Sequence, residues 1–177
     1  MAAATNTSVT RPPRQYTEAD RLADIAWLIE RGFTFWRCDL DGDNSTGRLR
    51  LIPAPPEEAD LVSSDTGEYV QMPVLDIDWN AEPAVAKILA YYDIRGEYRL
   101  VPSSTRGHWH LFVAERMVRR YYMRLLDRLR QDDVISDGYY RLCAILNQSV
   151  VRVPGQFKKP EADSFYERKP WPRPATP

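Results

Sequence analysis

Residues 74–79 read Val-Leu-Asp-Ile-Asp-Trp, and this short stretch decides the fold that the sequence predicts. Alternating apolar and acidic residues are typical of a half-buried β-strand, whose side chains point to opposite faces in turn. Leu75 and Ile77 are therefore expected to face a core, and Asp76 and Asp78 to share the other face. We expect one strand over residues 70–78.

Residues 103–113 read Ser-Ser-Thr-Arg-Gly-His-Trp-His-Leu-Phe-Val, and they predict a loop followed by a strand at 109–113. This stretch holds the only two histidines of the chain, His108 and His110, and alternation places both on one face of a strand that includes Trp109. The hydroxyls and backbone N–H groups of the loop before them suit a bound phosphate. A purely structural role for the histidines is the alternative.

The rest of the chain alternates between helical and extended patterns. Thr17 with Asp20 approximates a capping box, and Gly32 marks the end of the helix that follows. The other expected elements are strands at 33–40, 48–52, 98–101 and 150–153, a hairpin turn at 41–47, a loop at 53–69, and helices at 83–92, 115–130 and 138–146. This order predicts an α+β fold, with a mixed or antiparallel sheet and helices packed on it.

Length and composition predict one globular domain. The chain has 177 residues, 44% of them hydrophobic and 28% charged, and a net charge of −1 that by itself indicates no partner. We expect a flexible N-terminal tail at 1–15, a single domain at 16–159 and a Pro-rich arm at 160–177. No signal-peptide core and no run of ~18 apolar residues occurs, so a cytoplasmic protein outside the membrane is expected. Two cysteines are too few for a disulfide framework.

The paired carboxylates predict a metal site. Asp76 and Asp78 repel each other unless a cation lies between them, and Mg²⁺ or Mn²⁺ suits oxygen ligands from one strand. An edge strand with a solvated acidic face is the alternative. Residues 151–160, Val-Arg-Val-Pro-Gly-Gln-Phe-Lys-Lys-Pro, place Arg152 at a strand end and Lys158 and Lys159 after a turn. Beside a metal site these cations would neutralise phosphate charge.

Two other patterns in the sequence are weaker indications of function. Asp39, Asp41 and Asp43 resemble the start of a calcium loop, but Asn44 and Arg50 stand where that loop needs Gly and Glu, so a hairpin turn is expected. The helix predicted over residues 115–130 carries a large excess of arginine. This excess would suit a nucleic-acid backbone or, equally, a solvated helix face.

In their order along the chain, the D-x-D strand, the Ser/Thr-Gly-x-x-His strand and the R-x-P-G segment with lysines resemble the archaeo-eukaryotic primase superfamily, the primase-polymerases of plasmids, phages and mobile elements. The resemblance covers about residues 70–160. It implies a primase-polymerase-like core and a metal-dependent DNA or RNA nucleotidyltransferase of phage or plasmid DNA replication. In that family the D-x-D strand holds Mg²⁺ or Mn²⁺, which implies metal binding by Asp76 and Asp78, with Asp137 as the candidate for the third carboxylate.

The resemblance also implies a nucleotide site and partners. The residues it places at the nucleotide are Ser103, Ser104, Thr105, Gly107, His108, His110, Arg152, Lys158 and Lys159. The implied partners are a nucleoside triphosphate, single-stranded or primed DNA, and a separate replicative helicase. A phage-encoded protein of this kind would work in the host cytoplasm.

Departures from the family pattern keep other functions open. The Thr and Asn of the family's last motif have no clear counterpart, so a relative that binds nucleotide or DNA without polymerising is an alternative. His108-Trp109-His110 also fits the His-hydrophobic-His pair of rolling-circle nickases and relaxases, with Tyr121 or Tyr122 as nucleophile. Both tyrosines, however, are expected in the apolar stripe of the helix at 115–130, as core residues would be. A third alternative is a non-enzymatic phage accessory protein that binds a host partner.

Overall fold

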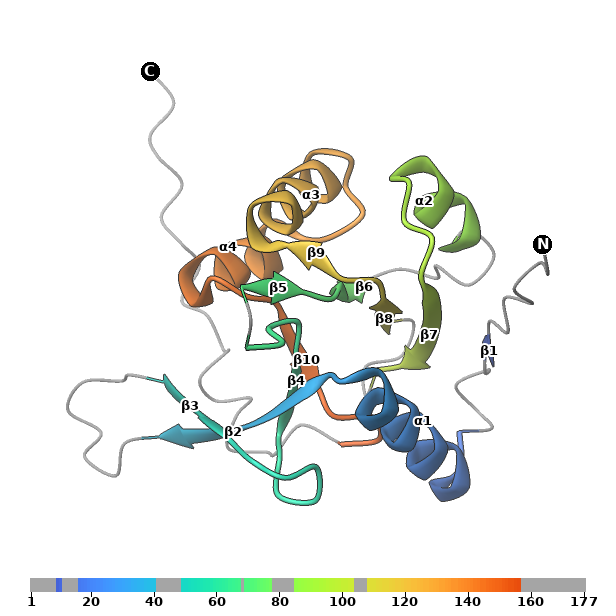
Figure 1. Ribbon diagram of the computed structural model, residues 1–177, viewed down its shortest axis with the longest axis vertical. Helices are drawn as coiled ribbons and strands as arrows, with labels where there is room; N and C mark the ends of the chain where they lie inside the picture. The colour runs from blue at the N-terminus through green and yellow to red at the C-terminus, as the bar shows by residue number, and fades with distance from the viewer. Residues whose placement is uncertain are drawn as a thin grey trace.

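The computed structural model describes residues 9–10, 16–40, 49–67, 69–77, 85–103 and 108–156 (Figure 1). The predicted tail and arm lie outside these residues, except for a two-residue strand near the N-terminus. In chain order the elements are β1 (Val9–Thr10), α1 (Glu18–Arg31), β2 (Thr34–Leu40), β3 (Leu49–Pro53), β4 (Leu61–Ser63), β5 (Val70–Gln71), β6 (Val74–Ile77), α2 (Val85–Tyr91), β7 (Glu97–Pro102), β8 (Trp109–Ala114), β9 (Met117–Val118), α3 (Arg119–Gln131), α4 (Asp137–Leu146) and β10 (Val150–Arg152).

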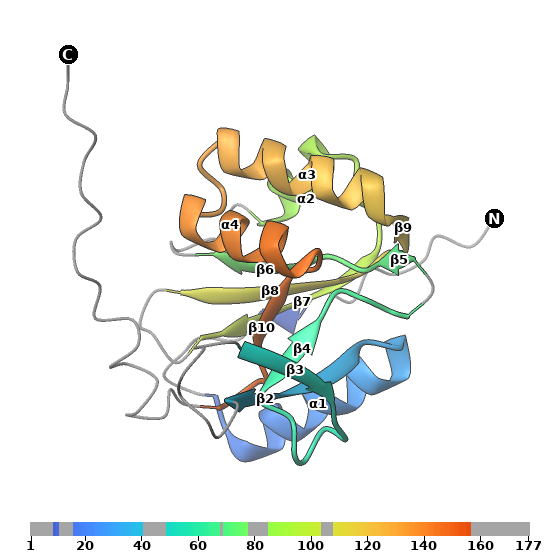
Figure 2. The same ribbon diagram turned by 90° about the vertical axis from the view of Figure 1, so that its left-hand side faces the viewer.

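Two four-stranded sheets form the framework, which confirms the α+β class. One sheet has the order β1-β7-β8-β6, with β7, β8 and β6 antiparallel and β1 parallel to β7; we call it the β8 sheet. The other, the β4 sheet, has the order β10-β4-β2-β3 and is antiparallel throughout. Helices α2, α3 and α4 lie on one side of the β8 sheet, with the β4 sheet and α1 on the other (Figure 2).

Helix α1 forms as its sequence signals predict. The backbone N–H of Asp20 donates to the Thr17 hydroxyl at 3.2 Å, and the N–H of Thr17 donates to the Asp20 carboxylate at 2.9 Å, which completes the capping box. Gly32 ends the helix with φ at 82°, a left-handed conformation that glycine adopts without a Cβ penalty. The helix then buries Trp27 and Leu28 against the core.

Three elements differ from the sequence prediction. The predicted loop at 53–69 contains β4, which pairs with both β2 and β10. A strand of three residues shows too little alternation to be recognised. The predicted strand at 70–78 is divided into β5 and β6 around Pro73, and the predicted helix at 115–130 begins only at Arg119 because β9 first pairs with β5. The single predicted sheet is accordingly replaced by two four-stranded sheets and one small pair.

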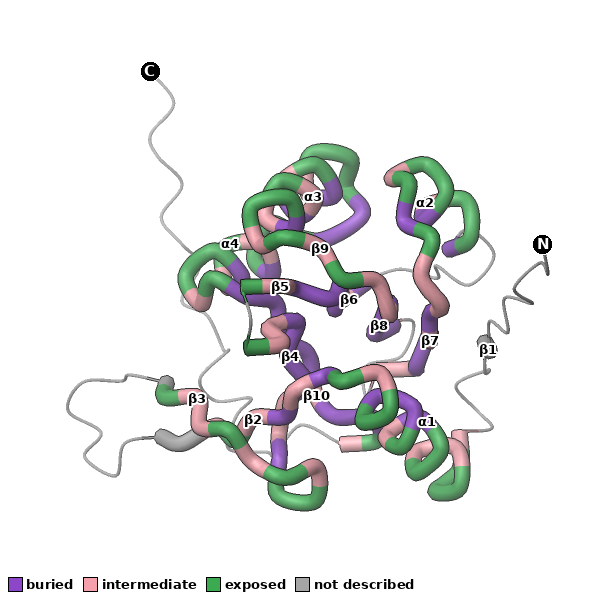
Figure 3. The backbone as a smooth tube through the Cα atoms, viewed as in Figure 1, coloured by how far each residue is buried: buried purple, intermediate pink, exposed green. Residues whose placement is uncertain are grey.

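Buried apolar side chains form one cluster that connects the helices with both sheets. Its largest fully buried members include Trp109, Tyr122 and Phe112. Figure 3 shows burial concentrated along the central strands, while the outer surfaces of the helices are exposed. Among the described residues, no helix combines the length and the apolar character that crossing a membrane requires.

Strand β6 lies at the edge of the β8 sheet, and helices cover its free edge. The Pro73 carbonyl accepts from Val113 N–H at 2.9 Å, so by alternation the backbone groups of Val74 and Asp76 point away from β8. The Tyr122 hydroxyl accepts from Val74 N–H at 3.2 Å and donates to the Val74 carbonyl at 3.1 Å. The Tyr139 hydroxyl donates to the same carbonyl at 2.7 Å. Side chains of α3 and α4 therefore satisfy this edge, next to Asp76, in place of another strand.

Candidate functional site

Asp76 and His110 lie directly opposite each other on the neighbouring strands β6 and β8. Because the Asp76 backbone points away from β8, this is a non-hydrogen-bonded pair, the kind that brings facing side chains closest. The His110 Nε2 atom is 3.7 Å from the Asp76 Oδ1 atom. The prediction that these two side chains share one sheet face is confirmed.

The other face of β6 is buried, as the alternation predicts. Leu75 is 1% exposed and Ile77 is fully buried in the core under the helices. The Asp76 side chain keeps 35% of its surface exposed, so its carboxylate can reach solvent and a ligand. The strand thus presents one polar group from an otherwise apolar stretch, which favours a functional role over a solvated acidic face.

His110 is a buried, neutral imidazole. Burial is the main reason that its pKa falls to about 3, and the positive charges of Arg152 and His108 lower it further, while a hydrogen bond to the Arg152 backbone partly opposes them. The ring is 5% exposed and packs edge-on against Phe112 at 6.4 Å between centroids. Its Nδ1 atom is buried without a hydrogen-bond partner among the described residues. A buried, unsatisfied nitrogen of this kind requires an explanation, and a bound ligand supplies one.

Arg152 reaches His110 from the other sheet. It ends β10, which pairs with β4, and its charge and backbone both act on the His110 ring. The Nε atom of Arg152 is also buried without a partner in the described part of the chain. Each of the three sequence motifs therefore contributes one residue to the region where the β8 sheet faces the β4 sheet. These residues are Asp76, His110 and Arg152.

A further arginine, Arg99, was not identified from the sequence. It lies on β7 opposite Phe112, and therefore on the same face of the β8 sheet as His110. Its guanidinium carbon is 5.4 Å from the centre of the Trp27 ring, and its Nε atom is buried without a partner among the described residues. The available signal was a cation within an otherwise apolar strand, Tyr98-Arg99-Leu100-Val101.

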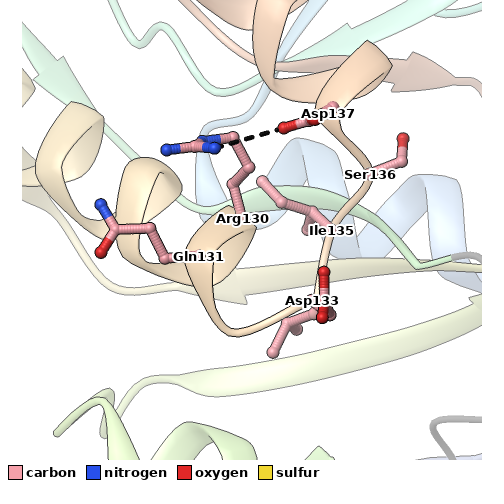
Figure 4. A pocket seen from close by; sticks show the side chains of 7 residues that line it. Arg130, Gln131, Asp133, Ile135, Ser136 and Asp137 are labelled. Carbon is pink, nitrogen blue, oxygen red and sulfur yellow. Dashed lines mark hydrogen bonds and ion pairs between the residues drawn. The ribbon is translucent and has the colours of Figure 1, made fainter. Parts of the chain in front are cut away.

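Asp137 lies apart from this cluster. It begins α4 with its side chain 66% exposed, and its Oδ1 atom pairs with the Arg130 Nη1 atom at 3.3 Å (Figure 4). Both residues line a cavity at the connection between α3 and α4. Within the described residues no three His, Cys, Asp or Glu side chains gather as one metal site. Asp137 therefore does not join Asp76 and His110, and the geometry does not support it as the third carboxylate.

The remaining predicted site residues are only partly described. Ser103 N–H donates to the His108 carbonyl at 2.9 Å, which ties together the two ends of the loop that precedes β8. His108 is half-buried and close enough to His110 to influence its pKa. The predicted residues that lie outside the described ranges are Asp78, Ser104, Thr105, Gly107, Lys158 and Lys159.

Asp76 is the one described carboxylate that a hard divalent ion could use at this position. Mg²⁺ is commonly held by one or two carboxylates, with waters and substrate phosphates completing its coordination. Asp76 supplies one such carboxylate, half-exposed and beside a neutral imidazole. A full set of protein ligands is therefore not required at this position, and phosphate oxygens of a bound nucleotide are suitable partners.

The two tyrosines of the nickase hypothesis have different environments. Tyr122 is fully buried, and its hydroxyl is bonded to Val74 and Ser149. Burial raises the pKa of Tyr122, which disfavours the phenolate that would attack a phosphodiester. Tyr121 is 60% exposed, so the prediction that it belongs to the apolar stripe of α3 is wrong. Helix α3 covers the side of the β8 sheet away from the β4 sheet, whereas His110 faces Arg152 (Figure 2).

Comparison of the chain with models of protein families, with curated proteins and with solved structures finds no match.

Proposed function

We propose that the protein is a primase-polymerase-like nucleotidyltransferase that uses Mg²⁺ or Mn²⁺ and a nucleoside triphosphate. The observation that carries the proposal is the convergence of Asp76, His110 and Arg152 from three separate segments. Asp76 and His110 are paired across two strands, and Arg152 reaches them from the other sheet. These three residues come from the D-x-D strand, the histidine strand and the R-x-P-G segment, the motifs on which the family resemblance rests.

Each residue has a role that follows from its chemistry. Asp76 would hold the metal through its exposed carboxylate, with Asp78 as the second expected ligand. A bound Mg²⁺ or Mn²⁺ lowers the pKa of the attacking hydroxyl and neutralises charge on the leaving pyrophosphate. His110 is neutral at physiological pH, and its one N–H is held by the Arg152 backbone. Its unpartnered Nδ1 atom is therefore left to accept a hydrogen bond, which suits a sugar hydroxyl.

The two arginines supply positive charge that does not depend on pH. Guanidinium groups bind phosphate through two parallel hydrogen bonds and stay charged throughout the physiological range. Arg152 and Arg99 each have a buried Nε atom without a partner among the described residues. Burial of such donors without a partner costs about 1–3 kcal/mol each, and an anionic ligand would recover that free energy.

Labelled-nucleotide addition to primed DNA, with Mg²⁺ or Mn²⁺, tests the proposal directly. We expect metal-dependent incorporation by the unmodified protein and none by Asp76→Asn, which removes one ligand charge from a half-exposed position without altering the core. Glu58→Gln is the matched control, because its carboxylate is exposed on the β4-sheet side and pairs only loosely with Arg37 at 3.8 Å. Calorimetry with Mn²⁺ and nucleoside triphosphate gives a second readout.

The two readouts separate the remaining functions. Nucleotide binding that Asp76→Asn abolishes, without incorporation by the unmodified protein, would identify a relative that binds but does not polymerise. No incorporation and no nucleotide binding would reject the proposal and favour an accessory protein. A covalent DNA adduct that Tyr121→Phe removes would replace the proposal with a nickase.

A further inference from the structure

We propose that the exposed face of α3, together with Tyr91 at the end of α2, binds a single strand of nucleic acid. The face consists of Arg120, Tyr121, Arg124 and Arg128. The three arginines follow one another at four-residue spacing, so they rise by about 6 Å each along the helix. With Tyr121 they lie within an arc of about 100° of the helix surface, opposite the buried side of the helix.

The positive charge of this face is largely available to a partner. Arg120 and Arg124 form no ion pair with any described carboxylate. Asp127, the acidic residue of α3, binds Arg130 and Gln131 instead, through bonds of 2.8 Å. Arg128 meets Asp132 only at 3.9 Å, where both side chains are exposed. Exposed pairs of that length contribute little, so the face keeps its net positive charge.

Two exposed tyrosines accompany the arginines. Tyr121 is 60% exposed beside Arg120, whose guanidinium lies 6.0 Å from its ring centre. Tyr91 is 66% exposed, and its orientation is fixed on two sides. Its ring packs edge-on against Tyr92 at 4.9 Å, and its hydroxyl accepts from Arg128 at 3.1 Å. Both rings are therefore held at the surface, where a flat ligand can reach them.

This combination fits a nucleic-acid strand better than an acidic peptide. Proteins that bind single strands combine a track of cations for the phosphates with aromatic rings on which bases stack. An acidic peptide would use the arginines and leave both rings without a role. The two tyrosines lie at either side of Arg124 and Arg128 along the surface, so stacking and phosphate contacts can alternate along one strand.

The surface is separate from the candidate nucleotide site. Helices α2 and α3 cover one side of the β8 sheet, and the β4 sheet lies on the other side (Figure 2). His110 interacts with Arg152 of β10, which belongs to the β4 sheet. The inference deepens the proposed function. It rests on that function only for the reason why a strand is bound, as the primer or template of nucleotide addition. It predicts that strand binding and nucleotide binding can be abolished independently.

Fluorescence anisotropy with a labelled oligothymidylate, over a series of salt concentrations, tests the inference. The combined variant Arg120→Gln, Arg124→Gln and Arg128→Gln should weaken binding at least about tenfold. Each lost phosphate contact lowers the slope of log affinity against log salt by about 0.7, so the slope should fall by about 2. The pair Tyr91→Leu and Tyr121→Leu should also weaken binding about tenfold, with the slope unchanged, because stacking does not depend on released counterions.

The matched control removes three exposed arginines from other surfaces: Arg37→Gln, Arg50→Gln and Arg141→Gln. It has the same net charge as the α3 variant and should keep near-normal affinity. Equal losses in both variants, or no binding by the unmodified protein, would overturn the inference. A loss of affinity in the arginine variant alone would also overturn the inference, because it would show that the tyrosines do not contact the strand. Nucleotide binding by calorimetry should be normal in all α3 variants, and strand binding without nucleotide binding would reject only the proposed function.

Discussion

The hydroxyl of Tyr139, on α4, donates a 2.7 Å hydrogen bond to the carbonyl of Val74, two residues before Asp76. Tyr122 of α3 contacts both the carbonyl and the N–H of the same residue, and also Ser149. The strand that carries Asp76 is therefore held at its free edge by two helices. Stability and site geometry are coupled at this point.

Removal of these hydroxyls should destabilise the fold in a definite order. Tyr139→Phe should lower the free energy of unfolding by about 1 kcal/mol, since the Val74 carbonyl keeps the Tyr122 bond. Tyr122→Phe should cost about 2–3 kcal/mol, because it leaves the buried Val74 N–H without a partner and removes the bonds to the Val74 carbonyl and the Ser149 hydroxyl. Urea unfolding with an unchanged m-value measures both losses. Tyr121→Phe, whose ring is exposed on the same helix, is the control and should stay within about 0.5 kcal/mol. Similar losses for Tyr121→Phe and Tyr122→Phe would contradict the edge contacts.

Stability should decline in mild acid because of His110. Its pKa is about 3 in the folded protein and near 6.5 in the unfolded chain, so the unfolded state binds a proton first. The contribution of neutral His110 to the free energy of unfolding is fully present above pH ~6.5 and is lost as the pH falls from there toward 3. The free energy of unfolding should then fall with a slope approaching about 1.4 kcal/mol per pH unit. Urea unfolding between pH ~7.5 and ~5.5 isolates this group from most carboxylates.

Two variants test whether His110 is the group that causes the pH dependence of stability. His110→Gln should flatten the slope whatever its effect on absolute stability, since it removes the titrating group. His108→Gln should leave the slope in place. A steep slope that persists in His110→Gln, or disappears in His108→Gln, would show that another group is responsible.

The two cysteines should react at very different rates. Cys143 is fully buried, and burial raises the pKa of its thiol to about 12, whereas Cys38 is half-exposed. Only the thiolate is nucleophilic, so a disulfide reagent should titrate one thiol in the folded protein and two after unfolding. Cys38→Ser should leave no fast-reacting thiol. Rapid modification of Cys143 in the folded Cys38→Ser variant would contradict its position in the core.

Two glycine-to-alanine substitutions should change the stability of the fold in opposite directions. Gly155 has φ at 75°, and a Cβ atom there would lie 2.5 Å from Cδ and 2.9 Å from Cγ of Arg21. Gly155→Ala should therefore cost about 1–2 kcal/mol. Gly138, inside α4, has no atom within 4 Å of a built Cβ, so Gly138→Ala should stabilise by about 0.5–1 kcal/mol. Thermal unfolding of both variants compares them directly, and a stabilised Gly155→Ala would show that the turn after Arg152 is not packed on α1.

Local signals predicted most of the elements but not their arrangement. The Thr17–Asp20 capping box, the glycine at the end of α1 and the alternation around Asp76 depend on neighbours in sequence, so they can be recognised from the chain. The pairing of Asp76 with His110 across 34 positions followed only from the resemblance in motif order. The entry of β4 between β2 and β10 is set by contacts far apart in sequence, and a three-residue strand carries no detectable period.

The site was predictable where strand alternation applies and unpredictable elsewhere. Asp76 and His110 share a face because alternation and register decide it. Arg99 was missed because its role depends on which strands become neighbours. Asp137 is a candidate only through the family resemblance, and helix α4 directs its side chain toward Arg130 and solvent. Tyr121 was assigned to the apolar stripe next to Tyr122, although neighbours on a helix differ by about 100° in direction.

The closed edge of β6 also limits how extended chains can approach the protein. Many peptide-binding domains accept their ligand as an added strand on an open sheet edge, through main-chain hydrogen bonds. At Val74 those backbone groups are already taken by Tyr122 and Tyr139. An extended ligand therefore cannot pair its backbone with Val74. A ligand that approaches Asp76 over the face of the sheet would instead be recognised through side chains.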